Sequence, residues 1–278
     1  MRQERQIELL ARIANAGEGL HGLYGSSSMV SDAAMYVDPE RFAAEQRVLF
    51  REGPVFFGMS ADVREPGSWR AMRFDGVPIV VVRQADGSLR ALVNMCRHRG
   101  APLVDPVGHG TGLRSFSCPY HAWNYELDGA LRTRPAAQHA FDDVSMNCDL
   151  VSRPIVEKYG LIFVRPGGDE PIDIDAALGG AQDDLGAFGL DDYVLIDSRQ
   201  HDWDFNWKLL FDTFSETYHI RTLHRATLGG MFHSESVFEP FGRNLMLTGL
   251  RSDVSTEFNK PEDERSLLPY GTIQYFLV

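Results

Sequence analysis

Apolar side chains recur at two different spacings along the chain, and the spacing changes near residue 54. Residues 4–14 carry apolar side chains every three or four positions, which predicts a short amphipathic helix, and the Gly- and Ser-rich stretch that follows to Ser28 predicts a loop. A second helix is expected from Asp38, because aspartate is a favoured N-cap and Pro39 suits the first helical position. This second helix would carry Val48 towards a core.

The region from residue 54 to residue 166 has the pattern of antiparallel strands. Residues 77–82 and 89–95 flank Asp86-Gly87, and residues 115–127 lead to Asp128-Gly129, two dipeptides that favour hairpin turns. Residues 161–164 predict a further strand. We therefore expect a β domain here.

Beyond residue 166 the pattern predicts a mixture of helix and strand. Residues 167–192 form an acidic connector with a weak helix, residues 204–222 are the longest helix candidate, and strand-like runs return from residue 238. The predicted fold class is α+β. Its expected parts are an N-terminal helix and loop at residues 1–35, a β domain at 36–166 and a second domain at 167–278.

Composition and charge narrow the class of protein. The 278 residues are 44% hydrophobic and 24% charged, as in a globular protein with a sizeable core. A net charge of −12 argues against a nucleic-acid surface or an anionic membrane as the main partner. No apolar run approaches the roughly 20 residues that cross a bilayer. We therefore expect a cytoplasmic chain. Three cysteines are too few for a disulfide framework, so in a reducing compartment some of them are expected to serve metal binding or catalysis.

Two short loops each contribute one cysteine and one histidine. Cys96 and His98 form a Cys-x-His pair, Cys118 and His121 form a Cys-x-x-His pair, and 19 residues separate His98 from Cys118. Each pair follows a predicted strand. Two thiolates and two neutral imidazoles are the donor set of a Rieske-type [2Fe–2S] cluster, in which histidines replace two of the cysteines on one iron. Gly100 suits a tight loop beside such a cluster.

A structural zinc site is the main alternative for these four residues, because Cys2His2 also binds zinc. The order of ligands favours the iron–sulfur site: common zinc fingers place both cysteines before both histidines, whereas each loop here has one of each. Pro119 and Trp123 are expected to shield the second loop. Cys148 lacks a metal-ligand partner at useful spacing and is predicted to be a small buried apolar residue.

A polar stripe within residues 204–222 is the second candidate site. On a regular helix Asp212, Glu216 and His219 would share one face, and a solvated face with a satisfied histidine is the simplest alternative reading. His219 and His224 lie five residues apart, about 140° around a regular helix, so the helix must end or distort for both to reach one metal. Two histidines with one carboxylate would bind Fe(II) and leave open positions.

These motifs in this order, together with Asn206-Trp207-Lys208, resemble the α subunit of the Rieske non-heme iron oxygenases. The resemblance covers the chain from about residue 36 to its end. It implies that a curved antiparallel sheet surrounds a long helix in the second domain. The functional residues that the resemblance implies are the cluster ligands Cys96, His98, Cys118 and His121, the mononuclear-iron ligands His219 and His224, and Glu216 as a carboxylate bridging the two sites across a subunit boundary.

The chain departs from the family pattern in two ways. The family's third iron ligand is an acidic residue more than about a hundred positions past the second histidine, whereas 54 residues follow His224 here. We therefore expect a chain truncated at its C-terminus. Many relatives also have Asp where Glu216 stands. The remaining carboxylates after His224, which are predicted to be solvated, are Asp253, Glu257, Glu262, Asp263 and Glu264.

The resemblance also implies the chemistry and the partners. Electrons from NAD(P)H would arrive through a reductase, with or without a ferredoxin, and cross from His121 (or His98) through Glu216 to His219. O2 and a small organic substrate, aromatic or other, would meet at the mononuclear iron of a homotrimer or α3β3 assembly. A Rieske electron carrier without oxygenase chemistry and a regulatory subunit are the alternatives from other classes.

Overall fold

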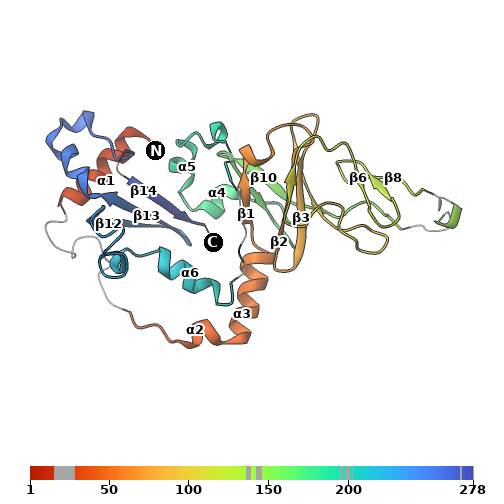
Figure 1. Ribbon diagram of the computed structural model, residues 1–278, viewed down its shortest axis with the longest axis horizontal. Helices are drawn as coiled ribbons and strands as arrows, with labels where there is room; N and C mark the ends of the chain where they lie inside the picture. Colours follow the sequence, from red (N-terminus) through yellow and green to blue (C-terminus); the bar gives the residue numbers. More distant parts are fainter. Residues whose placement is uncertain are drawn as a thin grey trace. The chain divides into compact units, whose positions relative to one another are not determined.

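The structure is a computed structural model that describes residues 1–15, 29–135, 139–141, 146–194, 196–197, 201, 203–269 and 271–277. Its contacts divide the chain into two compact units (Figure 1). The β-rich unit consists of Ala43–Ile174 and Gly189–Asp202. The terminal unit, which contains both chain ends, consists of Met1–Phe42, Asp175–Phe188 and Trp203–Val278.

The β-rich unit contains three antiparallel sheets, and its hairpins confirm the two turns expected from the sequence. Gly87 turns β3 into β4 with φ +85°, and Gly129 turns β7 into β8 with φ +100°. The larger sheet has the order β5-β2-β3-β4-β9, and the two smaller sheets have the orders β1-β11-β10 and β6-β7-β8. The strands are β1 (Val55–Met59), β2 (Trp69–Phe74), β3 (Val77–Arg83), β4 (Leu89–Val93), β5 (His109–Gly110), β6 (Phe116–Ser117), β7 (Asn124–Tyr125), β8 (Leu131–Thr133), β9 (Ser152–Arg153), β10 (Ile155–Lys158) and β11 (Leu161–Val164).

Strand β3 is buried on both faces and separates two cores. Val80 and Val82 point into a core that also holds the buried cysteines, while Ile79 and Val81 point into a second core beneath β1 and β11. Successive side chains of a strand alternate between faces, so four consecutive apolar residues suit a strand that is covered on both sides. The buried strand β3 in turn positions the first ligand loop, because β4 pairs with β3 and the chain runs from β4 directly into this loop.

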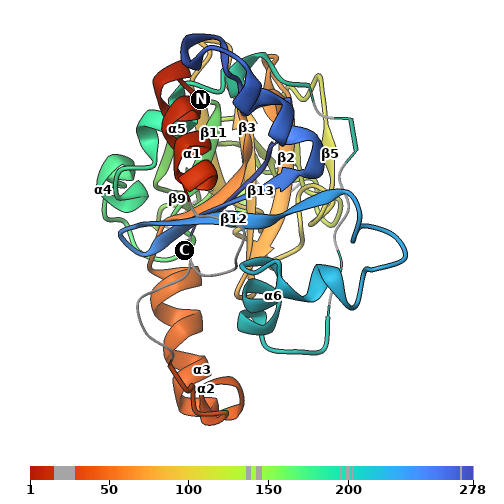
Figure 2. The ribbon, with the colours of Figure 1, turned by 90° about the vertical axis from the view of Figure 1, so that its left-hand side faces the viewer.

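The terminal unit is built on the antiparallel sheet β12-β13-β14, with helices on both faces (Figures 1 and 2). Helix α1 packs Leu9, Leu10 and Ile13 against one face, where they are at most 3% exposed. On the other face, Phe211 of α6 contacts Phe276 of β14 with ring centroids 5.0 Å apart. The elements are α1 (Gln3–Asn15), α2 (Ala34–Val37), α5 (Gln182–Gly186), α6 (Trp207–Phe214), a 3-10 helix (Tyr218–Arg221), β12 (Phe232–Phe241), β13 (Asn244–Arg251), two 3-10 helices (Ser252–Asn259 and Glu262–Glu264) and β14 (Gly271–Phe276).

Short helices connect the sheets. The N-terminal helix and the Asp38 cap are confirmed: Asp38 Oδ1 accepts the Glu40 N–H at 2.9 Å as α3 (Pro39–Glu45) begins. The expected burial of Val48 is wrong, because the π-helical turn Gln46–Arg51 that follows leaves Val48 45% exposed. The acidic connector forms α4 (Ile174–Leu178), α5 and a 3-10 turn at Leu190–Asp192. Within the described ranges, no helix is long and apolar enough to cross a membrane.

The long helix expected at residues 204–222 is also wrong, because α6 ends at Phe214. The Ser215 hydroxyl donates to the Phe211 carbonyl at 2.7 Å, which supplies a side-chain partner where the helix stops. The Glu216 carboxylate then accepts the N–H groups of Tyr218 and His219 and starts a separate 3-10 turn. Asp212, Glu216 and His219 therefore do not share one helical face.

Candidate metal sites

The first ligand loop is closed by backbone hydrogen bonds around Cys96. The Cys96 N–H donates to the Ala101 carbonyl at 2.9 Å, and the Gly100 N–H donates to the Cys96 carbonyl at 2.9 Å. Gly100 has φ +72°, a backbone conformation that favours glycine, and a Cβ there would lie 3.3 Å from the Met95 sulfur. Asn94, 1% exposed, accepts the Leu103 N–H at 2.9 Å and holds the far end of the loop.

The second loop repeats the same closure around Cys118. The Cys118 N–H donates to the Trp123 carbonyl at 2.8 Å, and the Ala122 N–H donates to the Cys118 carbonyl at 3.0 Å. Ala122 takes φ +56° at the position that corresponds to Gly100. Both loops therefore present a cysteine at the base and a histidine near the tip of the same kind of turn.

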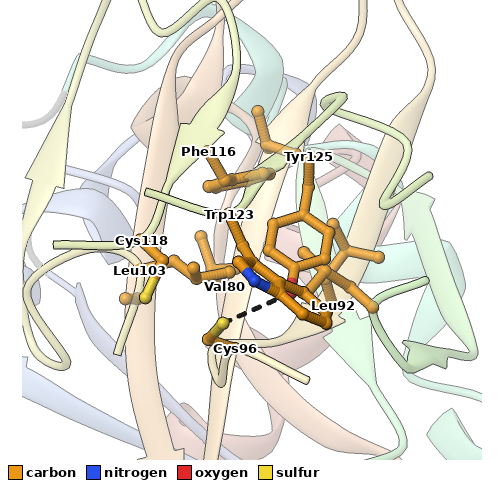
Figure 3. Close-up of a cluster of buried hydrophobic side chains, with 11 residues drawn as sticks. Val80, Leu92, Cys96, Leu103, Phe116, Cys118, Trp123 and Tyr125 are labelled. Carbon is orange, nitrogen blue, oxygen red and sulfur yellow. Dashed lines mark hydrogen bonds between the residues drawn. The ribbon is translucent and has the colours of Figure 1, made fainter. Parts of the chain in front are cut away.

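The two loops place their cysteines in the same core and their histidine rings beside each other. Cys96 and Cys118 are each 3% exposed, and Figure 3 shows both sulfur atoms on the same side of the buried cluster. The rings of His98 and His121 lie beside each other, with centroids 4.6 Å apart. His98 Nδ1 is buried and has no hydrogen-bond partner within the described part of the chain. Buried polar atoms are seldom left unpaired, so this nitrogen is available to a ligand.

The Tyr125 side chain contacts the first loop at Cys96 and Arg97. Its hydroxyl accepts the Arg97 N–H at 3.1 Å and lies 3.3 Å from the Cys96 sulfur, the contact dashed in Figure 3. Either atom can be the donor in this contact, but a Cys96 thiolate has no hydrogen, so the Tyr125 hydroxyl would donate to it. Burial raises the pKa of Tyr125 well above its ordinary value, and the bond with Cys96 raises it further. The Tyr125 hydroxyl therefore stays protonated and can donate to a thiolate at Cys96.

Aromatic side chains cover the histidine of the first loop. The His98 ring stacks on Trp123 at 5.0 Å with an interplanar angle of 7°, and Phe141 meets both rings edge-on. The Arg134 guanidinium lies 5.2 Å from the centre of the Trp123 ring. Burial, followed by the nearby His121 and Arg99, lowers the pKa of His98 and favours the neutral imidazole that metal ligation requires.

The second site forms where α6 ends. Glu216 contacts His219 Nδ1 with one carboxylate oxygen, while its other oxygen accepts the His219 N–H at 3.2 Å. The rings of His219 and His224 have centroids 5.4 Å apart. The turn after the 3-10 helix, in which the Leu223 N–H donates to the His219 carbonyl at 2.8 Å, brings the two histidines together despite their five-residue spacing. Since Nδ1 of His219 is engaged by Glu216, its Nε2 remains available to a ligand.

A cavity of about 190 Å³ adjoins these two histidines. One wall comes from the segment between α6 and β12, and the other comes from the sheet β12-β13-β14. Most of the surface that lines the cavity is apolar. The lining residues are Thr213, Phe214, Glu216, Thr217, His219, Ile220, His224, Leu228, Phe232, Leu247, Gly249 and Gln274.

The other residues singled out in the sequence lie elsewhere. Asp212 is exposed and accepts the Tyr36 hydroxyl. Glu257, predicted to be solvated, is 1% exposed instead, because it pairs with Lys260 at 2.6 Å and accepts the Ser266 N–H at 2.9 Å. Asp253 and the three carboxylates of residues 262–264 are exposed. Cys148 is half-buried beside the cysteine-containing core rather than fully buried.

No group of three or more His, Cys, Asp or Glu side chains that could hold a metal ion occurs among the described residues. A [2Fe–2S] cluster with two protein ligands on each iron does not need such a group. Three protein ligands around a single iron would need one.

Family models match both halves of the chain. Residues 53–157 match the Rieske [2Fe-2S] domain, and residues 190–271 match the ring hydroxylating alpha subunit (catalytic domain). The chain belongs to the Rieske oxygenase α-subunit family. The resemblance seen in the sequence is thus confirmed, and so is the α+β fold class, which the solved Rieske oxygenases share. Members of this family use a [2Fe–2S] cluster and a mononuclear iron, and take electrons from NAD(P)H through a reductase.

Relatives of this Rieske protein act on several classes of small molecule. The chain is 30% identical over 206 residues to the glycine betaine monooxygenase oxygenase subunit of Chromohalobacter salexigens, which covers 74% of this chain and 45% of the relative. It is also 30% identical over 190 residues to putrescine 2-hydroxylase of Ralstonia nicotianae, covering 68% and 48%. The chain spans about half the length of the curated relatives it matches.

Two solved structures share the fold. A quaternary ammonium Rieske monooxygenase in complex with an inhibitor superposes with a TM-score of 0.72 at 23% identity, covering 80% of this chain and 62% of that one. A naphthalene 1,2-dioxygenase variant bound to phenanthrene superposes with a TM-score of 0.69 at 20% identity, covering 92% and 67%. At these identities the likeness extends to the fold alone.

Some residues of the two sites were not found by sequence reasoning. Tyr125 lies seven positions past Cys118 in the sequence, and only the pairing of β7 with β6 brings its hydroxyl to Cys96 on the other loop. Gln274 lies 50 positions past His224 and reaches the cavity through the sheet register. The sequence signal for Gln274 is an amide side chain that interrupts the strand-like run at residues 272–278.

Proposed function

We propose that this chain is the oxygenase component of a multicomponent Rieske oxygenase, and that it oxidises a small organic molecule by hydroxylation or demethylation. The observation that carries this proposal is the occurrence, in one chain, of two Cys/His loops and a separate pair of histidines beside a cavity. An electron-transfer protein needs the first of these features and has no use for the second.

Cys96, His98, Cys118 and His121 are the proposed cluster ligands. Two observations support a fit to the cluster: the donor set of two thiols and two imidazoles, and the unpaired, buried Nδ1 of His98. The protein contributes rigidity through the matching backbone closures, a hydrogen-bond donor through Tyr125, and exclusion of water through Trp123.

His219 and His224 are the proposed protein ligands of the mononuclear iron, which when bound supplies O2 activation. Glu216 orients His219 through Nδ1 and so presents Nε2 towards the cavity. In the assembled protein, the Glu216 carboxylate would also accept a hydrogen bond from the free ring nitrogen of His121 in a neighbouring subunit. This contact implies a homotrimer or α3β3 assembly. The cavity would hold the substrate against the two histidines.

Several finer assignments belong to the same proposal. The electron donors are a reductase and, in some systems, a ferredoxin. The substrate comes from the range in the names of the relatives, from glycine betaine, carnitine and putrescine to dinitrotoluene and naphthalene. The domains run over residues 36–166 and 167–278, and a reducing compartment such as the cytoplasm suits the free thiols.

A Rieske electron carrier without oxygenase chemistry is the second candidate function. The lack of a three-residue metal group in the described ranges favours it, because a firmly held iron requires a third protein ligand. The two candidates differ in whether His219 and His224 bind a metal at all.

Titration with Co(II), a spectroscopic substitute for Fe(II), separates the two candidates. The cluster-loaded chain is expected to give visible bands from a nitrogen- and oxygen-ligated Co(II), and His219→Ala and His224→Ala should abolish them. His109→Ala, which changes an exposed histidine of β5, is the matched control and should keep the bands. Equal spectra from all four proteins would reject the second metal site and leave the electron carrier.

A further inference from the structure

The cavity beside His219 and His224 has one unpaired polar group on its sheet wall. Gln274 lines the cavity from β14, and its Oε1 is buried without a hydrogen-bond partner in the part of the chain that the structure describes. Around it the sheet contributes Leu247, Gly249 and Phe232. A buried carbonyl oxygen without a donor is unfavourable, and in native proteins such an atom calls for a specific explanation.

The sheet register explains why Gln274 faces the cavity. Gln274 pairs with Leu247 of β13, and both line the cavity. The neighbouring residues Ile273 and Tyr275 point to the opposite face, where they pack on the core beneath α1. Phe276, two positions on and therefore on the same face as Gln274, contacts Phe211 of α6. Apolar side chains alone could pack against this face of the sheet, so the polar amide of Gln274 is unusual here.

We propose that Gln274 is a specificity-determining residue that accepts a hydrogen bond from the substrate. This inference rests on the proposed function, since it takes the cavity to be the substrate pocket. It narrows the substrate class to small, largely apolar molecules that carry an N–H or O–H donor. An apolar hydrocarbon or a quaternary ammonium group would leave Oε1 unpaired, whereas a donor would satisfy it and leave the apolar walls to hold the rest of the molecule.

Indole and indene form a matched pair of probes, because they share shape and size and differ in the N–H donor. The affinity of each for the 278-residue chain can be measured by ligand-observed NMR titration. The wild-type chain should bind indole about two- to tenfold more tightly than indene, the range expected of one neutral hydrogen bond. Gln274→Met keeps the length of the side chain without the amide, and should make the two affinities equal.

Thr248→Val is the matched control. Thr248 is fully buried and its Oγ1 also lacks a described partner, but its side chain does not line the cavity. This variant should keep the wild-type preference for indole. A preference that persists in Gln274→Met, or is absent from the wild type, would overturn the inference. Binding of neither probe would overturn it as well, while the Co(II) titration would still decide the proposed function separately.

Discussion

At the scale of single residues, the Tyr125 hydroxyl lies 3.3 Å from the Cys96 sulfur, within hydrogen-bonding distance. With Cys96 as a thiolate ligand the O–H would donate to the sulfur, and such a hydrogen bond stabilises the more negative, reduced form of a cluster. Tyr125→Phe should therefore lower the midpoint potential by about 40 mV, taking about 1 kcal/mol for the bond. A redox titration of the reconstituted chain, followed by electron paramagnetic resonance, measures the shift.

The control for this prediction is Tyr120→Phe. Tyr120 is 59% exposed and stacks on His121 with centroids 3.9 Å apart, so this variant removes a hydroxyl near the same site and keeps the ring. Its potential should match the wild type. An unchanged potential in Tyr125→Phe would mean that the hydroxyl does not donate to the sulfur.

The role of a single residue could be predicted from the sequence when the residues that it acts with lie close to it in the chain. Cys96 with His98, and Cys118 with His121, lie within four positions, so each pair is visible as a local motif. Glu257 was predicted to be solvated, because its neighbours are charged, yet the backbone N–H of Ser266 and the ammonium of Lys260 pair with it in the interior. Such partners are set by tertiary packing.

At the scale of elements, α1 covers one face of the sheet in the terminal unit. Leu10 is fully buried in the core that α1 shares with β12 and β13, and Arg5 and Arg12 both pair with Glu239 of β12. Leu10→Ala should cost about 2–5 kcal/mol of unfolding free energy, because it leaves a cavity in this core. Urea denaturation measures it. The control is Glu4→Ala, on the exposed side of the same helix, which should change the unfolding free energy by less than about 0.5 kcal/mol. Equal losses in Leu10→Ala and Glu4→Ala would contradict the packing of α1 on this sheet.

An ion pair joins two sheets of the β-rich unit. Arg83 of β3, 8% exposed, donates two hydrogen bonds to Glu157 of β10 at 2.6 and 2.7 Å. This pairing lowers the pKa of Glu157 below its ordinary value of 4.5. A carboxyl whose folded-state pKa is lowered contributes stability above its unfolded pKa, and that contribution is lost as the pH falls through the folded value.

Glu157→Gln should therefore lower the unfolding free energy at neutral pH by an amount on the order of 1 kcal/mol, and the difference from wild type should shrink as the pH falls below the ordinary pKa of 4.5. Denaturation curves across this pH range measure it. Glu126→Gln is the control, since Glu126 makes a more exposed pair with Arg132 at 3.4 Å. A difference that stays constant with pH would show that the charge of Glu157 is not involved.

The elements themselves were predictable where local signals decide them. The hairpins at Gly87 and Gly129 followed from turn residues between apolar runs. The helix at residues 204–222 was overextended, because its apolar spacing continues past Phe214 while Ser215 and Glu216 bond to the backbone and end it. Competition between side chain and backbone for the same hydrogen bonds is weakly encoded in periodicity.

At the scale of the whole molecule, the two candidate sites should differ in how firmly they hold iron. Four ligands are proposed for the cluster, whereas the proposed iron ligands His219 and His224 have no third metal-binding side chain in the described ranges. After reconstitution and desalting, we expect about two irons per chain, because two neutral histidines bind a divalent cation weakly. Iron analysis measures this ratio, and a firmly held third iron would show that a further residue of this chain completes the second site.

Long-range organisation was the least predictable part. Residues 1–15 and the sheet at residues 232–276 are far apart in sequence, yet they share a core and an ion-pair network. The cavity likewise combines a turn after α6 with Gln274 of β14. Sequence motifs indicated both candidate metal sites, but the walls of the cavity depend on strand register.

The most direct test of the account is the midpoint potential and electron paramagnetic resonance spectrum of the chain reconstituted with iron and sulfide. One cysteine and one histidine from each loop predict a brown protein with two irons and two sulfides in its cluster, and a potential within about −150 to +300 mV. His121→Cys should lower that potential, because an anionic ligand replaces a neutral one. A colourless zinc protein, or a cluster near about −400 mV in the wild type, would contradict the assignment of two histidine ligands.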